Sequence, residues 1–460
     1  MNLTLSQFRE FIPQRPTFGL FGYPVAHSVS PQLHAALFQQ NHIKADYIAV
    51  EVPPHQLEEA FSLAKEKLLG CNLTIPHKIN ILPFLDEIDE DAAALGSVNT
   101  VLFSAGKSYG YNTDIDGMSL AFKRDNLSLR GKEVLILGNG GVSAMAAYLC
   151  AKNGARVTVC ARNPKGPKAE RLYQLLRRCG YSIRITDFSH VPERTQIIIN
   201  GTPVGMSPEE GHTPLSLSQC PWTQYVFDCI YNPRRTTLLK EAKTRGIPYQ
   251  DGLLMLVGQA ARAQELWTGA HFQPKQLLET EQMIAVQLMF KRLREHYHRE
   301  NLVLCGFMGC GKTSVANCLG KFLDITPLDT DQLVEQQEKK TIATIFKEHG
   351  EETFRSLERE AVRKASSQKG TIISLGGGAV LDPRNVEVVK QTGLLVWLDT
   401  PIERILEVLR GDTTRPLAKG GEPALRARHD SRTPIYRHAC DLRVSGITIE
   451  DLCREVCESI

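Results

Sequence analysis

One short segment of the chain has the residue types and the spacing of a phosphate-binding loop. Gly306–Thr313 reads G-F-M-G-C-G-K-T and fits the pattern G-x-x-x-x-G-K-[ST] at every fixed position. Glycines such as Gly309 and Gly311 let backbone amides surround phosphate oxygens. The Lys312 ammonium can reach the outer phosphates, and the Thr313 hydroxyl can bind Mg²⁺. The segment therefore predicts a site for a nucleoside triphosphate and its magnesium ion.

A second glycine-rich turn follows the apolar run Val134–Leu137 in the first half of the chain. Gly138, Gly140 and Gly141 stand where a strand gives way to a predicted helix, and Ser143 takes a place where a third glycine is common. Such a turn lets backbone N–H groups approach a pyrophosphate at the start of the helix. Turns of this kind also occur without a ligand. The residues after the next strand therefore decide whether a dinucleotide site is predicted here.

Those residues are basic rather than acidic. An NAD site carries an acidic residue about 20 residues after the glycine turn, where it binds the ribose 2′-hydroxyl. Here the predicted strand Arg156–Ala161 is followed by Arg162, Lys165 and Lys168, whose charges suit the 2′-phosphate of NADP. The glycine turn, the spacing and the charges together predict an NADP site, with Arg162 and Lys165 at the 2′-phosphate.

Four polar clusters lie ahead of the glycine turn, and each follows or ends a predicted strand. Open α/β sheets place ligand-binding groups at the carboxyl ends of their strands, so these clusters are candidates for a substrate site. Taken singly, each would be a turn or a helix cap. The clusters are Gly22–Pro31 (G-Y-P-V-A-H-S-V-S-P), Asn72–Lys78 (N-L-T-I-P-H-K), Ser97–Thr100 (S-V-N-T) and Tyr111–Asp114 (Y-N-T-D).

Short apolar runs alternate with amphipathic stretches along most of the chain, which is the pattern of βαβ units with parallel sheets. The early strands are predicted at Thr17–Phe21, Asp46–Val50, Asn72–Ile75 and Val98–Phe103. Helices are predicted between them at Pro31–Asn41 and Gln56–Leu68. In the second half, strands are predicted at Leu302–Cys305, before Asp329–Asp331 and at Thr371–Ser374. The length of 460 residues suggests about three folding units.

The composition of the chain argues against nucleic-acid-binding, membrane-spanning and secreted classes of protein. The net charge of +3 is too small to indicate a nucleic-acid partner. No run of about 18 apolar residues occurs, so no membrane partner is expected, and the first residues lack the pattern of a signal peptide. The 12 cysteines form no C-x-x-C pair and are expected to be free thiols. We therefore expect a cytoplasmic protein with small-molecule substrates.

Taken in order, the polar clusters and the glycine turn resemble the shikimate dehydrogenase family over about Phe18–Leu278. Gly22–Pro31 is similar to the shikimate-binding opening of that family. Asn200–Met206 (N-G-T-P-V-G-M) resembles its loop beside the cofactor. Asp251–Ala261 (D-G-L-L-M-L-V-G-Q-A-A) resembles its C-terminal substrate segment.

This resemblance implies NADPH-dependent reduction of the ketone 3-dehydroshikimate to shikimate. Lys78 and Asp114 match the catalytic pair, and a lysine beside a carboxylate can hold and move the proton that the ketone oxygen needs. Thr202 and Gly252 match positions beside NADP(H). The positions that match substrate-binding residues are Ser28, Ser30, Thr74, Asn99, Tyr231 and Gln259.

The second half resembles the shikimate kinase family over about Leu302–Leu452. The implied reaction transfers the γ-phosphate of ATP to the 3-hydroxyl of shikimate, so that the product of the first half is the substrate of the second. Besides the phosphate-binding loop, the shared motifs are D-T-D at Asp329–Asp331, F-R at 354–355, L-G-G-G-A at Leu375–Ala379, R-P-L at Arg415–Leu417 and R-T-P-I-Y at Arg432–Tyr436.

The kinase resemblance also implies a role for each matching residue. Asp331 matches the residue that accepts the hydroxyl proton, and Asp329 matches one that helps Thr313 to hold Mg²⁺. Arg355 and Arg432 match a pair that binds the substrate carboxylate, for which the planar guanidinium is suited. The remaining matches are Gly376, Gly377 and Gly378 beside the substrate, the lid arginine Arg415 at the transferring phosphoryl group, and Arg410 against adenine.

These patterns predict an α/β protein built from three-layer, parallel-sheet domains. We expect a substrate domain at 1–116 that is completed by 253–290, and a Rossmann NADP domain at 117–252. A linker at 291–300 and a P-loop kinase domain at 301–460 are expected to follow. Whether the chain forms a homo-oligomer is left open.

Other interpretations stay open at this point. A metabolite-sensing regulator without catalysis could share these motifs, and so could a chain with only one active domain. In the first half, Ala144 stands where the cofactor loop of the family often has an arginine, and A-R-N at 161–163 replaces N-R-T. A quinate-active dehydrogenase that prefers NAD is therefore the nearest alternative for this half.

Overall fold

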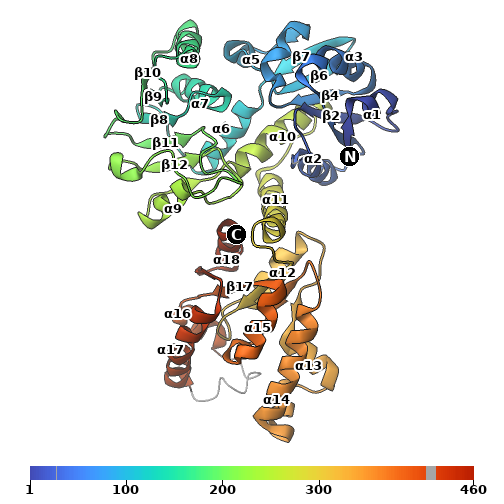
Figure 1. Cartoon of the computed structure of the whole chain (residues 1–460), viewed down its shortest axis with the longest axis vertical. Helices are drawn as coiled ribbons and strands as arrows, with labels where there is room; N and C mark the ends of the chain where they lie inside the picture. The colour runs from blue at the N-terminus through green and yellow to red at the C-terminus, as the bar shows by residue number, and fades with distance from the viewer. Residues whose placement is uncertain (27, 411–420) are drawn as a thin grey trace. The chain divides into compact units, whose positions relative to one another are not determined.

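The computed structural model describes residues 1–26, 28–410 and 421–460 (Figure 1). The chain divides into two compact units, Met1–Ile284 and Ala285–Ile460. The first unit contains two sheets and the second contains one. The predicted α/β class, with helices on both faces of largely parallel sheets, is confirmed.

Seven strands form the first sheet, in the spatial order β1-β3-β2-β4-β6-β7-β5. These strands are β1 (Asn2–Thr4), β2 (Thr17–Gly22), β3 (Asp46–Glu51), β4 (Gly70–Leu73), β5 (Glu87–Ile88), β6 (Thr100–Ser104) and β7 (Lys107–Tyr111). The helices between them are α1 (Leu5–Glu10), α2 (Ser30–Gln40), α3 (Leu57–Lys67), α4 (His77–Asn80) and α5 (Glu90–Leu95).

The first sheet is mixed, because β6 pairs antiparallel with both β4 and β7. The sequence pattern predicted parallel pairing throughout and gave no bounds for the strand before Tyr111, which is β7. Ala105 and Gly106, which join β6 to β7, have φ of 50° and 77°. Two successive positive φ values are what a two-residue hairpin turn requires, so the antiparallel pair β6–β7 is built locally.

Alternate side chains of this sheet point to opposite faces, and each face has its own core. Phe21 and Val50 belong to a buried cluster with residues of α1 and α3. Phe18 and Tyr47, on the other face, pack with residues of α2 and of α10 (Leu253–Thr268). The result is a three-layer arrangement that fixes the carboxyl ends of β2 and β4.

The second sheet has six parallel strands in the order β10-β9-β8-β11-β12-β13. Val134 and Ile136 face a core formed with α6, α7 and α8, whereas Leu135 and Leu137 face one formed with α9. The strands are β8 (Glu133–Leu137), β9 (Arg156–Cys160), β10 (Arg184–Thr186), β11 (Ile197–Asn200), β12 (Tyr225–Asp228) and β13 (Tyr249–Gln250). The helices are α6 (Asp114–Arg124), α7 (Gly141–Lys152), α8 (Pro167–Arg178) and α9 (Thr237–Thr244).

The third sheet, in the second unit, has five parallel strands in the order β15-β16-β14-β17-β18. Its central strand β14 is buried along its whole length. The strands are β14 (Asn301–Cys305), β15 (Leu328–Asp329), β16 (Ile372–Ser374), β17 (Gly393–Leu398) and β18 (Leu442–Val444). The helices are α12 (Lys312–Lys321), α13 (Thr330–Glu338), α14 (Ile342–Ser366), α15 (Pro383–Thr392), α16 (Ile402–Leu409), α17 (Gly421–Ala439) and α18 (Ile449–Ser459).

The helix α11 (Pro274–Glu295) contains the division between the two compact units. It also covers the first half of the segment 291–300 that the sequence predicted as a linker. Leu293, the single aliphatic residue of that segment, is fully buried. In the part of the chain that the structure describes, no helix has the length and apolarity needed to cross a membrane.

All 12 cysteines are free thiols. Each sheet carries one in a fully buried strand position, namely Cys71 on β4, Cys160 on β9 and Cys305 on β14. Burial disfavours the charged thiolate and raises the pKa of all three thiols, to about 12 for Cys160.

Candidate active sites

Lys78 and Asp114, the predicted catalytic pair, are in direct contact. Lys78 lies in α4 after β4, and Asp114 is the first residue of α6 after β7. Lys78 Nζ donates a hydrogen bond to Asp114 Oδ2 over 2.7 Å, and the side chains are 28% and 17% exposed. A partly desolvated ammonium that touches a carboxylate can deliver a proton to a substrate oxygen and recover it from the carboxylate.

Asn99 holds the carboxylate of Asp114 from the other side. Its Nδ2 donates to Asp114 Oδ1 over 2.9 Å. Its Oδ1 accepts hydrogen bonds from the backbone N of Thr113 at 2.8 Å and from Thr100 Oγ1 at 3.1 Å. Because both oxygens of Asp114 are engaged, the carboxylate has one orientation. Thr100 and Thr113 lie within the predicted polar clusters, but their supporting contacts were not predicted.

The hydroxyl residues of the predicted substrate site lie at neighbouring strand ends. Ser30 is the first residue of α2 and Ser28 lies two residues before it, where Ser28 Oγ donates to Ser30 Oγ over 3.1 Å. Thr74 directly follows β4. Within the described part of the chain, no hydrogen bond joins these three side chains to the Lys78–Asp114 pair.

Gln259 reaches this region because α10 packs closely against α6. A Cβ atom at Gly117 of α6 would overlap the carbonyl oxygen of Met255 and lie 2.9 Å from the backbone N of Gln259. Only glycine permits this approach. Gln259 itself is 8% exposed, and its Nε2 donates to a backbone carbonyl of its own helix. Tyr231, which was also predicted at the substrate, is partly buried, and this burial raises the pKa of its phenol.

The glycine turn between β8 and α7 has the backbone that a pyrophosphate site needs. Gly138 has φ of 95°, and Gly140 and Gly141 lead directly into α7. A Cβ atom at either Gly140 or Gly141 would meet nothing within 4 Å, so the start of the helix is open to a ligand. Ser143, in place of a third glycine, lies with its Oγ 3.3 Å from the carbonyl oxygen of Gly201. These residues fit a dinucleotide phosphate.

The basic residues after β9 are available to a ligand. Arg162 and Lys165 are exposed and form no ion pair within the described residues. Gly252, also predicted beside the cofactor, precedes α10, where a Cβ atom would overlap the carbonyl oxygen of Cys229. The close approach of these two backbone segments is by itself a sufficient reason for glycine at this position.

Thr202 is supported by a buried network that the sequence did not reveal. Its Oγ1 donates to Asn200 Oδ1 over 2.7 Å, and Asn200 Nδ2 donates to Asp228 Oδ1 over 3.0 Å. Asp228 Oδ2 accepts from Thr236 Oγ1 at 2.7 Å. Asp228 is fully buried, and this desolvation raises its pKa to about 7 despite the three hydrogen bonds that it accepts.

Substituting Asp228→Asn is expected to change how stability depends on pH. A carboxyl with a pKa of about 7 in the folded chain and about 3.9 in the unfolded chain binds more protons when folded. Its contribution to the free energy of unfolding therefore falls as the pH rises from about 4 to about 7, by up to about 1.4 kcal/mol per pH unit. Thermal unfolding at several pH values should show this decline in the wild type and a flatter curve in the variant. Equal slopes would contradict the prediction.

The P-loop, Gly306–Thr313, connects the buried strand β14 to α12. Gly309 and Gly311 have φ of 78° and 97°. Lys312 is 8% exposed, and its Nζ donates to the carbonyl oxygens of Gly306 at 2.9 Å and Phe307 at 3.0 Å. The ammonium is therefore directed into the loop rather than into solvent, as a phosphate site requires.

Three hydroxyl and carboxylate groups meet beside the P-loop. Thr313 Oγ1 donates to Asp329 Oδ2 over 2.8 Å, and Ser374 Oγ donates to the same oxygen over 3.1 Å. Ser374 was not predicted; it ends β16 directly before L-G-G-G, and β16 lies between β14 and β15. Oxygen groups of this kind suit Mg²⁺, which needs few protein ligands when phosphates and waters supply the rest. Among the described residues, no group of three or more His, Cys, Asp and Glu residues forms a further metal site.

Asp331, Arg355 and the glycine triplet converge on one loop after β16. A Cβ atom at Gly376 would overlap Asp331 Oδ1, and one at Gly378 would lie 2.7 Å from Arg355 Nη1. Arg355 Nη1 also donates to Glu358 Oε2 over 2.8 Å. Glu358 is 2% exposed, and this burial raises its pKa. Its spacing of three residues from Arg355 on a helix could have indicated this contact.

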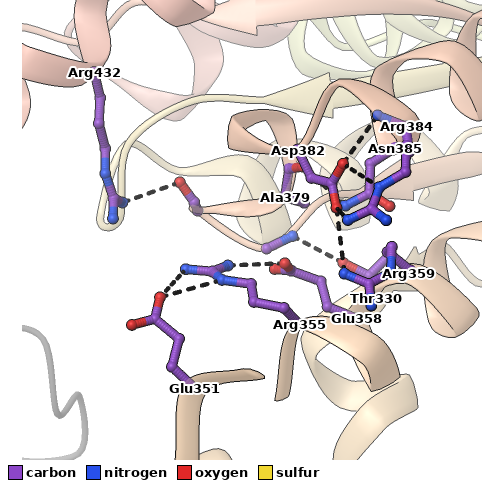
Figure 2. Close-up of polar contacts among 12 residues, drawn as sticks. Thr330, Glu351, Arg355, Glu358, Arg359, Ala379, Asp382, Arg384, Asn385 and Arg432 are labelled. Atoms are coloured by element: carbon purple, nitrogen blue, oxygen red, sulfur yellow. Dashed lines mark hydrogen bonds and ion pairs between the residues drawn. The ribbon is translucent and has the colours of Figure 1, made fainter. Parts of the chain in front are cut away.

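Arg432 approaches the same loop from α17. Its Nη1 donates to the carbonyl oxygen of Gly377 over 3.3 Å, and Tyr436 Oη donates to the same oxygen over 2.6 Å. The guanidinium also lies 6.0 Å from the ring centroid of Phe307. Figure 2 shows Arg355 and Arg432, which come from the different helices α14 and α17 and lie beside Gly378 and Gly377, so both could contact one substrate carboxylate. Arg410 directly follows α16, and the predicted lid residue Arg415 lies outside the described residues.

A dinucleotide-type glycine turn in the first unit and a P-loop in the second define the class: a nucleotide-dependent α/β enzyme with two active sites. A family model described as shikimate dehydrogenase substrate binding domain matches residues 20–101, and one described as shikimate kinase matches residues 308–460. The chain belongs to the shikimate dehydrogenase family over its N-terminal part and carries a shikimate kinase domain after it.

Similar proteins support this assignment for the first unit. The NADP⁺-dependent shikimate dehydrogenase of Shouchella clausii is 39% identical over 256 residues, which are 55% of this chain and 92% of the relative. A solved shikimate dehydrogenase in complex with NADP⁺ is 34% identical, with a TM-score of 0.55 over 59% of this chain and 96% of its own. A chorismate mutase/shikimate 5-dehydrogenase fusion protein from Clostridium acetobutylicum is 30% identical, with a TM-score of 0.56 over 60% and 99%.

Proposed function

We propose that this chain catalyses two consecutive reactions of the shikimate pathway. The first is NADPH-dependent reduction of 3-dehydroshikimate to shikimate, and the second is ATP-dependent phosphorylation of shikimate to shikimate 3-phosphate. The observation that carries the proposal is that one chain holds both a formed Lys78–Asp114 pair and a formed P-loop. The oxygen that gains a proton in the first reaction is the nucleophile of the second.

In the first site, protein side chains transfer the proton, and the cofactor transfers the hydride. NADPH supplies the hydride that reduces the ketone carbon. Lys78 Nζ, held 2.7 Å from Asp114, donates the proton that the ketone oxygen receives. Asn99 keeps Asp114 oriented so that its carboxylate stabilises the ammonium before transfer. The residues proposed to bind the other polar groups of the substrate are Ser28, Ser30, Thr74, Tyr231 and Gln259.

Arg162 is proposed to bind the 2′-phosphate of NADPH, together with Lys165. Arg162→Ala should therefore raise the KM for NADPH about 10- to 100-fold, the range of one or two charge-assisted hydrogen bonds. The KM for NADH, which has no 2′-phosphate, should not change. Both values come from initial rates of cofactor oxidation, with Arg177→Ala, an exposed arginine of α8, as the control. Equal effects on both cofactors would contradict the assignment.

In the second site, the side chains would position the 3-hydroxyl of shikimate and neutralise the charges of its carboxylate and of the ATP phosphates. Arg355 and Arg432 would bind the shikimate carboxylate, and the glycine triplet would let the ring approach the backbone. Asp331 would accept the proton of the attacking hydroxyl, and Lys312 would contact the transferring phosphoryl group. Thr313 and Asp329 would hold Mg²⁺ beside the nucleotide phosphates.

The test of the complete proposal is product analysis by mass spectrometry. The purified chain is mixed with 3-dehydroshikimate, NADPH, ATP and Mg²⁺, and shikimate 3-phosphate is the expected end product. Omission of ATP should stop the sequence at shikimate, and omission of NADPH should prevent both products. Consumption of neither nucleotide would overturn the proposal and favour a regulatory role.

A further inference from the structure

Arg355, the proposed carboxylate-binding arginine of the kinase site, is contacted by two glutamates (Figure 2). Glu358 accepts a hydrogen bond from Nη1 at 2.8 Å. Glu351 Oε1 accepts from Nη2 at 3.0 Å and from Nε at 3.3 Å. Glu351 thus occupies one full side of the guanidinium, the two-donor arrangement that a substrate carboxylate would also use.

The two glutamates differ in their access to water. The side chain of Glu358 is 2% exposed, whereas that of Glu351 is 66% exposed. Removing Arg355 from Glu358 would leave a buried carboxylate without its cation, which is costly. Glu351 can exchange its contact for water at little cost, because exposed ion pairs are weak. Glu351 is therefore the partner that another anion can replace.

The backbone also sets Glu351 apart from the rest of its helix. Gly350, directly before it, interrupts α14 with φ of 78° and ψ of 177°. This conformation is accessible to glycine and rare for other residues, while a Cβ atom at Gly350 would meet nothing within 4 Å. The break in the helix therefore depends on a backbone conformation that glycine permits, and no neighbouring atom requires glycine there. It places Glu351 at the first position of the helical segment that carries Arg355.

We propose that Glu351 competes with the substrate for Arg355 and is displaced by the carboxylate of shikimate. The inference rests on the proposed function of the kinase site. With both glutamates in place, one guanidinium faces two carboxylates, so an incoming anion meets an excess of negative charge. Displacement of Glu351 requires a ligand that can supply a carboxylate of its own. Glu351 would thus weaken the binding of anionic substrates and leave the binding of uncharged ones unaffected.

The experiment compares Glu351→Gln with Glu352→Gln, a neighbouring exposed glutamate that has no ion pair within the described residues. Kinase rates are measured on the full chain with ATP, Mg²⁺ and shikimate, without NADP, so that the dehydrogenase is silent. Glu351→Gln should lower the KM for shikimate about two- to five-fold, the range expected for one exposed ion pair, and leave kcat unchanged. Glu352→Gln should change neither.

A second substrate separates charge competition from a change of shape. The methyl ester of shikimate has no charge to compete with Glu351, so its KM should be the same in the wild type and in Glu351→Gln. An unchanged or raised KM for shikimate in Glu351→Gln, or an equal fall for the ester, would overturn the inference. Those outcomes leave the proposed kinase function intact, which fails instead if the wild type does not phosphorylate shikimate or if Arg355→Ala does not raise its KM.

Discussion

Replacing Lys78 by methionine is expected to lower the kcat for reduction of 3-dehydroshikimate by about 10²- to 10⁴-fold, the range of general acid catalysis. The change removes the ammonium that Asp114 and Asn99 hold in place but keeps a side chain of similar length. The KM for shikimate phosphorylation should not change, because the P-loop lies in the other compact unit. The measurement is the rate of NADPH oxidation, paired with a kinase assay on the same preparation.

Lys65 offers a matched control for this substitution. Its Nζ lies 3.0 Å from Asp86 on the surface of the same unit, so Lys65→Met removes a lysine–aspartate pair of similar length outside the site. We expect nearly wild-type kcat for that variant, since exposed pairs contribute little. Loss of activity in Lys65→Met as well would show that folding, and not proton transfer, accounts for the effect. Wild-type kcat in Lys78→Met would contradict the assignment directly.

Replacing Lys312 by alanine is expected to lower the rate of phosphorylation by at least about 10²-fold and to leave reduction intact. Preorganised cationic and N–H donors at a developing charge each contribute about 10²- to 10³-fold to kcat, and Lys312 is the buried cation of the P-loop. The variant should convert 3-dehydroshikimate to shikimate and stop there. Mass spectrometry of the full reaction mixture would therefore show shikimate in place of its phosphate.

The control for Lys312→Ala is Lys321→Ala at the other end of the same helix. Lys321 is exposed and forms no ion pair within the described ranges, so its loss should leave both products unchanged. The thermal midpoints of both variants should be compared, because Lys312 also donates two hydrogen bonds to backbone carbonyls. Full kinase activity in Lys312→Ala would exclude the proposed role of the loop in this reaction.

Features that depend on a few consecutive residues could be predicted from the sequence. The P-loop and the glycine turn between β8 and α7 are of this kind. Their glycines either adopt positive φ or leave the start of the following helix uncovered, and neither property depends on distant parts of the chain. The predicted contact between Lys78 and Asp114 came from a resemblance and not from spacing, since 36 residues separate the two. The structure brings them together by placing β6 and β7 beside β4.

Contacts that depend on strand order or burial could not be predicted in this way. Ser374 meets Thr313 and Asp329 only because β16 is inserted between β14 and β15. Asp228 has a raised pKa because the second sheet and its helices bury it completely. The hairpin β6–β7 was missed although Ala105-Gly106 is a local signal, because the βαβ pattern of the surrounding chain favoured parallel pairing.

Each sheet contains a buried cysteine, on β4, β9 or β14, and the rate at which its thiol is alkylated measures how often that sheet opens. A fully buried thiol reacts with an alkylating reagent only when local or global unfolding exposes it. Labelling rates at Cys71, Cys160 and Cys305, read by peptide mass spectrometry, therefore give three opening free energies from one chain. Equal values would mean that the sheets open as one cooperative system, and separate values would rank the substrate, cofactor and kinase folds by their resistance to exposure.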